Sequence, residues 1–332
     1  GLVGAELRWR ACTMKYRQLG RSGLTVSEIG FGAWGIGGRT DGLTSYGDTD
    51  DRTSLLALAQ ALDSGISFFD TSAAYGNGHS EELIGIAFGH KRDHVVIATK
   101  AGYTSWNQAP DFSETAIIAS VEASLARLRS DYIDLLQLHN PPLEALRSTD
   151  LQAALGTLKT AGKIRSWGVS VKSPAEGVEA LTVFGAPVVQ ANFNMMDVRA
   201  VTDGLLDEVL RHGAGFIGRT PLCFGFLSGT ITRETKFAAG DHRSGWPRAQ
   251  LDNWIDGAAE LLSATESQPG MEGVQSALRF CLSFKALSTV IPGILAPSEA
   301  EQNARASDLG PLACATLHRV LEINRQRQFF VR

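Results

Sequence analysis

The feature that most constrains the fold of this chain is a regular alternation of short apolar, β-prone runs with amphipathic helical stretches. Apolar side chains recur every three to four residues between the runs, as at Leu55, Leu58 and Leu62, which is the spacing of a helix packed on a sheet. Strand-plus-helix units of about 30 residues favour parallel strands with right-handed crossovers. The pattern predicts an α/β fold, as a closed (β/α)8 barrel or, alternatively, an open doubly wound sheet. Runs that predict strands lie at residues 65–70, 95–100, 133–139, 164–170, 187–190, 215–219 and 288–291.

The length and apolar content of the chain fit one large domain. A barrel needs about 250 residues, and 332 residues with 44% hydrophobic composition provide enough core for one. We expect a single TIM-barrel domain over residues 14–332, with a short N-terminal hairpin and long loops, such as Thr230 to Asn253, at the C-terminal face. Because MKYRQLG from Met14 resembles a natural start, residues 1–13 are expected to be an extension outside the fold.

Charge and composition exclude several classes of partner. The net charge of −4 gives no general attraction to nucleic acid or anionic lipid. No apolar run approaches the roughly 18 residues of a membrane-spanning helix, so we expect a cytoplasmic protein whose partner is a small molecule. Monomer and homo-oligomer both stay open. The four cysteines, at positions 12, 223, 281 and 314, form no C-x-x-C pair, so we expect neither a disulfide framework nor a metal site.

Four ionisable residues fall where a barrel places its chemistry. Active sites of barrels form at the carboxyl ends of strands, and Asp70, Lys100 and His139 each occupy the last position of a predicted strand. Tyr75 lies in the loop just after the first of them. Taken singly, they have ordinary interpretations as a helix cap, a rim ion pair, a core histidine and a turn aromatic. Four residues suited to one reaction, in order at strand ends, are hard to obtain by independent accidents.

The motifs around these residues resemble the aldo-keto reductase family. FFDTSAAYG contains Asp70 and Tyr75, VVIATK ends at Lys100, and YIDLLQLHN contains His139. The resemblance covers nearly all of the chain from Met14, with the motifs in the family's order and spacing. It implies a catalytic tetrad of these four residues, and hydride transfer between NAD(P)H and a carbonyl or alcohol.

The chemistry of the four side chains agrees with that reaction. Adding a hydride to a carbonyl leaves an alkoxide, which needs a proton donor beside it. A phenol is a poor acid at its ordinary pKa of about 10, but a neighbouring ammonium stabilises the phenolate. We therefore expect Tyr75 to act as general acid and Lys100 to supply the charge. Asp70 would hold the ammonium in place, and His139 would donate a hydrogen bond to the substrate oxygen.

A glycine motif near the N-terminus is a weaker signal. Gly30, Gly32 and Gly35 in GFGAWG satisfy the G-x-G-x-x-G pattern, but that pattern requires a helix directly after it, and the sequence that follows is rich in turns. Asp50 stands about where a ribose-binding acid would, yet belongs to a general acidic cluster. In the family this segment is instead the first strand, which would place Gly32, Ala33 and Trp34 near the nicotinamide and substrate.

The resemblance implies further cofactor contacts. Ser170 and Gln190, at strand ends, would hold the carboxamide of the nicotinamide, while Val171 departs from the usual Asn and removes one such contact. Arg219 would lie beside the nicotinamide. The segment after it would follow the pyrophosphate, and a C-terminal segment would contact the adenosine. The implied residues are Asp70, Thr220, Pro221, Leu222, Gly225 and Leu227, then Gly293, Gln302 and Asn303.

The adenosine segment departs most from the family. NADP-dependent relatives place Lys or Arg there to pair with the ribose 2′-phosphate, whereas IPGILAPSEAEQN contains no cation. Glu299 would repel a phosphate and can accept hydrogen bonds from ribose hydroxyls. We expect NAD(H) to be used at least as well as NADP(H), which suits a dehydrogenase of sugars or secondary alcohols.

The substrate pocket is expected to have aromatic walls, which suit a sugar ring, a terpenoid or an aryl aldehyde alike. Two other functions stay open. Lys100 is a formal Schiff-base nucleophile for a lyase, although a neighbouring carboxylate keeps a lysine protonated. A non-catalytic nucleotide-binding regulatory subunit, like potassium-channel β subunits, is the other. The expected pocket residues are Trp34, Tyr75, Tyr103, Trp106, His139, Asn140, Phe224 and the loop around Trp246.

Overall fold

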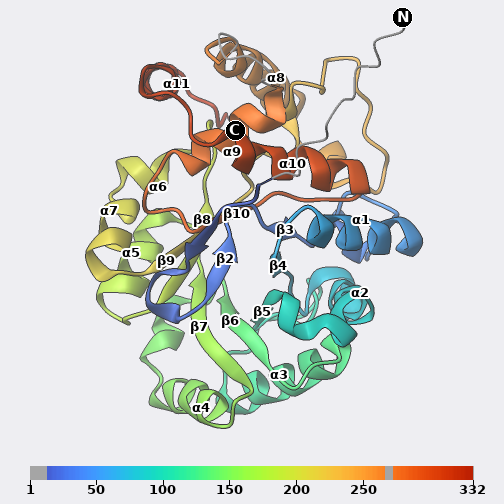
Figure 1. Cartoon of the computed structure of the whole chain (residues 1–332), viewed down its shortest axis with the longest axis vertical. Helices are drawn as coiled ribbons and strands as arrows, with labels where there is room; N and C mark the ends of the chain where they lie inside the picture. Colours follow the sequence, from blue (N-terminus) through green and yellow to red (C-terminus); the bar gives the residue numbers. More distant parts are fainter. Residues whose placement is uncertain (1–12, 266–271, 332) are drawn as a thin grey trace, which may run out of the picture.

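Eight parallel strands form the centre of the structure, a computed structural model that describes residues 13–265 and 272–331 (Figure 1). Isolated bridges from Ile29 to Val290 and from Gly32 to Gly293 join the first strand to the last. The sheet therefore closes on itself, and the predicted (β/α)8 barrel, rather than the open sheet, is confirmed. In order around the barrel the strands are β3 (Phe31–Gly32), β4 (Phe68–Asp70), β5 (Val96–Ala101), β6 (Ile133–His139), β7 (Ile164–Ser170), β8 (Val188–Asn192), β9 (Gly215–Arg219) and β10 (Thr289–Ile291).

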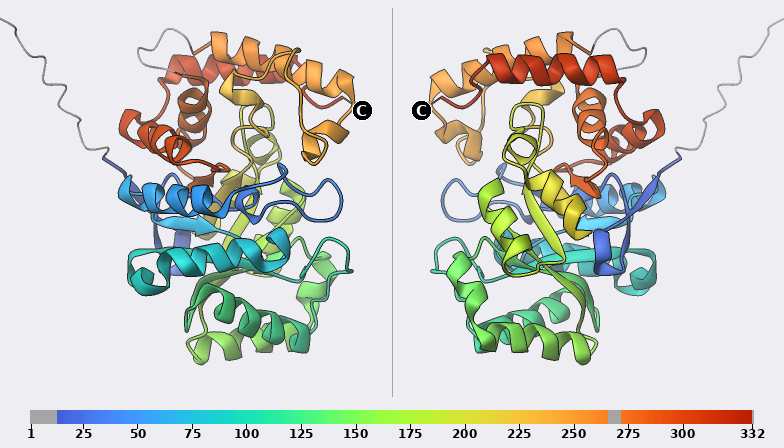
Figure 2. Two further views of the ribbon diagram at one scale, coloured as in Figure 1. Left: turned by 90° about the vertical axis from the view of Figure 1, so that its right-hand side faces the viewer. Right: turned by 90° about the vertical axis from the view of Figure 1, so that its left-hand side faces the viewer.

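Helices cover the outside of the barrel, and α8 to α11 gather at one end of the molecule (Figure 2). Several begin at a polar side chain that accepts a hydrogen bond from the first turn. Asp50 caps α1 in this way, which explains the acid that sequence spacing placed near a ribose. The helices are α1 (Asp51–Asp63), α2 (His79–Phe88), α3 (Glu114–Leu128), α4 (Thr149–Thr160), α5 (Pro174–Thr182), α6 (Arg199–Thr202), α7 (Leu205–His212), α8 (Arg248–Ser263), α9 (Gly273–Leu282), α10 (Pro297–Leu309) and α11 (Cys314–Gln326).

The predicted N-terminal hairpin closes one end of the barrel. Its strands β1 (Tyr16–Gln18) and β2 (Thr25–Ser27) pair antiparallel. Three apolar residues of the hairpin, Leu19, Leu24 and Val26, pack in one cluster with inward-facing residues of the barrel strands, which include Phe68 and Val188, the first residues of β4 and β8. The carboxyl ends are left open for a site. The strand residues of the cluster are Phe68, Ala98, Leu135, Val188, Ile217 and Ile291.

The structure corrects two strand ends. Lys100 is not the last residue of its strand, because β5 continues to Ala101. Gln190 lies in the middle of β8 and not at its end, since the ladder to β9 runs on through Asn192, which pairs with Arg219. Both side chains still lie close to the carboxyl end of the barrel.

The long loop from Thr230 is also shorter than expected. Its last six residues, from Arg248, already belong to α8, because a buried stripe that includes Leu251 and Trp254 packs that helix against the rest of the fold. Most of the predicted N-terminal extension, residues 1–12, lies outside the described residues.

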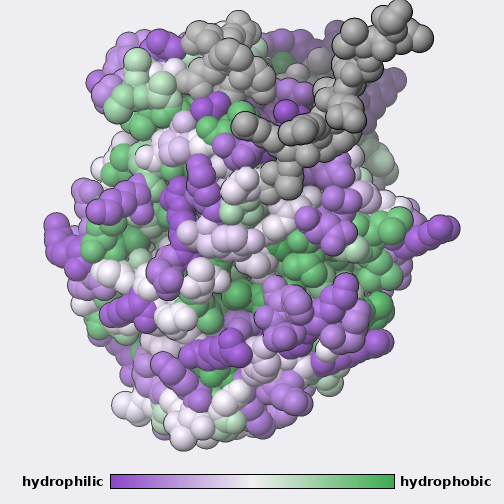
Figure 3. All heavy atoms as spheres, in the orientation of Figure 1, coloured by the Kyte–Doolittle hydropathy of each residue, from purple (hydrophilic) through white to green (hydrophobic). Residues whose placement is uncertain are grey.

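The molecular surface is mixed in character. On the face shown in Figure 3, hydrophobic residues are interspersed with hydrophilic ones. Among the described residues, no helix combines the length and the apolar content needed to cross a bilayer.

The hairpin turn yields a stability prediction. Gly20 has a φ of +50°, and a Cβ there would lie 2.1 Å from the Ala214 carbonyl carbon, whereas Gly23 has a φ of +80° with open space around it. Gly23→Ala should cost about 1 kcal/mol of unfolding free energy from backbone strain alone. Gly20→Ala should cost about 2 kcal/mol more, because the hairpin must also shift away from Ala214. Chemical denaturation measures both losses, and equal losses would contradict close packing of the hairpin turn against the barrel.

Candidate active site

The carboxyl ends of β4 and β5 bring three predicted residues into direct contact. Lys100 Nζ lies 2.5 Å from Asp70 Oδ1 and 3.1 Å from the hydroxyl oxygen of Tyr75. The same ammonium donates to the Thr71 carbonyl at 3.0 Å. Asp70 and Lys100 are each only 1% exposed. Neither charge can lose its partner cheaply at that depth, so the pair fixes the relative positions of the two strands.

The charge state of Lys100 follows from these contacts. Burial alone lowers the pKa of this lysine, but Asp70 and Tyr75 outweigh burial, and the pKa of Lys100 is raised above its ordinary value. Lys100 therefore carries its proton at neutral pH. An ammonium held against a phenol oxygen stabilises negative charge on that oxygen.

The loop that carries Tyr75 is held by close contact between two backbones. Gly76 has a φ of +60°, and a Cβ there would lie 2.2 Å from the Gly37 carbonyl oxygen, in the loop after β3. Asn77 also has a left-handed φ, of 54°. The turn-rich segment that follows the glycine motif thus supports the loop that carries Tyr75.

Two glutamines hold the other oxygen of Asp70. Gln137 Nε2 donates to Asp70 Oδ2 at 2.8 Å, and Gln190 Nε2 donates to the same oxygen at 2.9 Å. The glutamines also bond each other, from Gln190 Nε2 to Gln137 Oε1 at 2.7 Å. Gln137 was missed in the sequence. The available signal was its position two residues before His139 on one strand, which places both side chains on the same face.

His139 ends β6 and is buried beside the same group. Its Nδ1 lies 3.2 Å from the Ser72 hydroxyl, and that oxygen already accepts a hydrogen bond from the Ala74 amide. Burial lowers the pKa of His139 well below its ordinary value, and the charges of Lys100 and Arg219 lower it further. The imidazole is neutral. If the Ser72 hydroxyl donates to Nδ1, then Nε2 carries the ring proton.

Aromatic rings surround His139. The Tyr103 and Trp106 ring centroids lie 5.4 Å and 5.3 Å from that of His139, both edge-on, and Tyr75 lies 6.2 Å away. The structure therefore brings four of the predicted substrate residues together. Asn140 follows directly with a left-handed φ of 47°.

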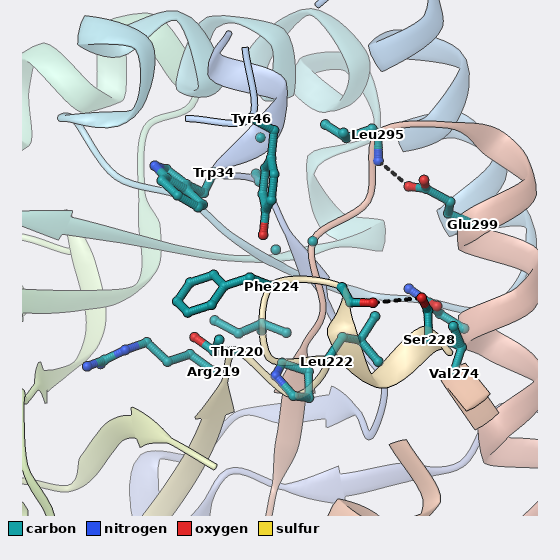
Figure 4. A pocket seen from close by; sticks show the side chains of 18 of the residues that line it. Trp34, Tyr46, Arg219, Thr220, Leu222, Phe224, Ser228, Val274, Leu295 and Glu299 are labelled. Atoms are coloured by element: carbon teal, nitrogen blue, oxygen red, sulfur yellow. Dashed lines mark hydrogen bonds between the residues drawn. The ribbon is translucent and has the colours of Figure 1, made fainter. Parts of the chain in front are cut away.

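A cavity of about 860 Å³ opens beside this cluster (Figure 4). Most of the predicted cofactor residues line it, and Figure 4 shows Trp34 and Tyr46 lying across it from Phe224 and Thr220. Leu227 does not line it, because its side chain is fully buried in the core. The predicted residues that line the cavity are Gly32, Ala33, Trp34, Asp70, Tyr75, Trp106, Gln190, Arg219, Thr220, Pro221, Leu222, Phe224, Gly225, Gly293, Gln302 and Asn303.

The strand ends beside Tyr75 are bridged by Arg219. Its guanidinium donates to the Ser170 hydroxyl at 3.0 Å and to the Val171 carbonyl at 2.6 Å. The Ser170 hydroxyl in turn donates to Asn140 Oδ1 at 3.1 Å. Ser170 is not one of the residues that line the cavity, and its hydroxyl is bonded to Arg219 and Asn140. Gln190 is the predicted carboxamide contact that does reach it.

The far end of the cavity is lined by α10 and the start of α9. Glu299 turns back on its own helix, where Oε2 accepts from the Leu295 amide at 2.6 Å. Gln302 Nε2 donates to Glu272 Oε2 at 2.7 Å. Asn303 Nδ2 is buried, and no hydrogen-bond partner for it occurs in the described part of the chain. A buried amide without a partner fits a ligand acceptor at this end.

A comparison with protein families decides which kind of protein this is. The model of the aldo/keto reductase family matches residues 28–325, which is most of the chain. The chain belongs to the aldo/keto reductase family. Membership makes it an oxidoreductase of carbonyl groups or alcohols that uses a nicotinamide cofactor.

Curated relatives and solved structures agree with this family. The chain is 32% identical over 301 residues to aldo-keto reductase YhdN of Bacillus subtilis, covering 87% of each. It is 30% identical over 321 residues to a probable voltage-gated potassium channel subunit beta of Oryza sativa, covering 90% of this chain and 93% of the relative. The holo form of aldo-keto reductase AKR11C1 from Bacillus halodurans superposes with a TM-score of 0.77 at 26% identity, and the match covers 94% of this chain and 96% of that structure.

Two further residues of this aldo/keto reductase line the cavity and were missed in the sequence. The Tyr46 ring lies 5.1 Å from that of Trp34, and the Arg243 guanidinium lies 4.8 Å from the Tyr46 centroid. Arg243 is also paired with Asp241 at 2.7 Å and donates to the Phe224 carbonyl at 3.0 Å. Tyr46 lies in a loop and Arg243 in a short 3-10 helix, His242–Gly245, and neither segment has a periodic apolar pattern, so the sequence held no signal that they meet over one cavity.

Proposed function

We propose that this aldo/keto reductase interconverts a carbonyl and an alcohol with Tyr75 as general acid and base. The observation that supports the proposal most strongly is the 3.1 Å contact between Lys100 Nζ and the Tyr75 hydroxyl, at the wall of a cavity large enough for a dinucleotide. Reduction of a carbonyl leaves an alkoxide. In the proposed step the Tyr75 proton passes to that oxygen, and Lys100 stabilises the phenolate that remains.

His139 would orient the substrate oxygen toward Tyr75. A neutral imidazole with its proton on Nε2 donates one hydrogen bond and adds no charge, so it polarises a carbonyl without competing as an acid. Ser72 is a positioning residue for that tautomer. Tyr103 and Trp106 exclude water around His139 and would form the wall that contacts the substrate.

The residues present fit a nicotinamide dinucleotide. When bound, it would supply or accept the hydride. Trp34 and Gln190 would flank the nicotinamide, and Thr220 to Gly225 would follow the pyrophosphate. Asn303 Nδ2, which has no acceptor among the described residues, would reach the adenine. Thr220, Cys223 and Phe224 have positive φ values of 57°, 47° and 57°. Backbone held in this sparsely populated region is typical of segments that wrap a ligand.

We further propose that NAD(H) is used at least as well as NADP(H). Glu299 places a carboxylate at the adenosine end and occupies the amides at the start of α10, which would otherwise attract a phosphate. Within residues 13–265 and 272–331, the cations that line the cavity are Arg219 and Arg243. Both are engaged with protein acceptors, so neither is free for a 2′-phosphate.

The structure argues against a Schiff-base lyase but is compatible with a regulatory subunit. A Schiff-base lyase needs a neutral lysine, but the pKa of Lys100 is raised and its ammonium bonds three oxygens. A regulatory subunit is favoured by the likeness to the rice channel subunit. That role is compatible with the assembled tetrad, and turnover by the isolated chain separates the two.

Replacing the phenol tests the acid. Tyr75→Phe removes the hydroxyl but keeps the ring, so the rate of NAD(P)H-linked carbonyl reduction should fall by roughly three orders of magnitude or more. Binary cofactor affinity should stay within a few-fold of wild type. Tyr132→Phe, on a tyrosine at the opposite end of the barrel, is the matched control. Unchanged turnover in Tyr75→Phe would exclude this residue as the acid.

Glu299 tests cofactor choice. The wild-type kcat/KM with NAD(H) should equal or exceed that with NADP(H), and Glu299→Gln should shift the ratio toward NADP(H) by about tenfold, because one repelling charge is gone. Glu301→Gln, an exposed acid on the same helix, should leave the ratio unchanged. A hundredfold wild-type preference for NADPH would end the proposal.

A further inference from the structure

We infer that Gln137 is a positioning residue that makes this site selective for cofactors with a carboxamide N–H. The inference rests on the proposed function, in which Gln190 contacts the nicotinamide. Gln137 is fully buried and does not line the cavity, so its effect must pass through the residues it bonds. Those residues are Asp70 and Gln190.

The orientation of both amides follows from the charge of Asp70. A carboxylate only accepts hydrogen bonds, so each glutamine must turn its NH2 group, and not its oxygen, toward Oδ2. Gln137 is then left with Oε1 toward Gln190, and it accepts the second N–H of that residue at 2.7 Å. Both protons of Gln190 Nε2 are thereby used inside the protein.

The consequence lies in what Gln190 offers to the cavity. Both N–H groups of its Nε2 already donate to protein acceptors, and among the described residues no hydrogen bond involves its Oε1. Gln190 can therefore present an acceptor but not a donor to a ligand. A carboxamide NH2 satisfies this acceptor. A ketone or carboxylate in its place leaves the acceptor unpaired, which costs binding.

Gln137 provides this selection because one hydrogen bond alone does not fix an amide. With Gln137 present, Gln190 Nε2 is held between two acceptors and its plane is set. Without it, the bond to Asp70 remains, but the amide can swing about that bond and Oε1 is no longer held toward the cavity. Selectivity for the carboxamide should then be lost, although the rest of the cofactor site is unchanged.

The test compares the binary dissociation constants of NAD⁺ and its 3-acetylpyridine analogue, in which a methyl group replaces the NH2. Wild type should bind the analogue about tenfold more weakly, the value of one buried hydrogen bond. Gln137→Met should reduce this ratio to within about threefold. Because the electronic difference between the two rings is the same in every variant, the change in the ratio reports on Gln190. Titration followed by tryptophan fluorescence provides the constants, since Trp34 lines the cavity.

Controls separate positioning from general damage. Leu138→Met, on the adjacent and outward-facing residue of β6, should keep the wild-type ratio. Every variant should also bind ADP-ribose, which lacks the nicotinamide, with the wild-type affinity. Gln190→Met should lower the ratio as Gln137→Met does. A wild-type ratio near one, or a ratio unchanged in Gln137→Met, overturns the inference while NAD⁺ binding still supports the proposed function. Failure of wild type to bind either dinucleotide overturns both.

Discussion

The buried ion pair between Lys100 and Asp70 is the interaction on which the site depends. It joins two neighbouring strands at the open end of the barrel, and each partner would be costly to bury alone. Desolvation favours loss of the lysine proton, yet the carboxylate and the phenol reverse that effect. The same contacts that keep the ammonium charged also place it against Tyr75. The contacts that stabilise the buried charges are therefore the same contacts that the proposed chemistry would use.

The two ends of the barrel differ in polarity, and this difference places the site at one of them. The hairpin fills the amino end with apolar side chains, while the carboxyl ends of β4 to β9 carry the polar ones. Polar side chains inside a barrel are costly unless they satisfy one another. Asp70 solves this problem with a lysine on one oxygen and Gln137 and Gln190 on the other. The network is rigid because every amide orientation in it is determined by a charge.

Sequence periodicity predicted an α/β fold with the closed barrel as the first of two forms, and motif order predicted the four residues of the proposed tetrad, which the structure brings together. They were not enough for Gln137 or Tyr46. In the sequence, Gln137 only interrupts the apolar run of a predicted strand. Its structural role depends on a hydrogen bond to Gln190, 53 positions away. Tyr46 lies in an irregular loop, where no period predicts what faces the cavity. Strand ends misplaced by one or two residues, as at Lys100, reflect ladders that continue beyond the apolar run.

The most direct test of this account removes the ion pair without leaving a lone buried charge. The double variant Asp70→Asn, Lys100→Met keeps the site neutral, so it avoids the cost of an unpaired carboxylate. Single-turnover measurement of hydride transfer should show a rate at least about a thousandfold below wild type, because Tyr75 has lost the neighbouring ammonium. Binding of the cofactor should persist. A double variant that transfers hydride at the wild-type rate would contradict the central role of this pair.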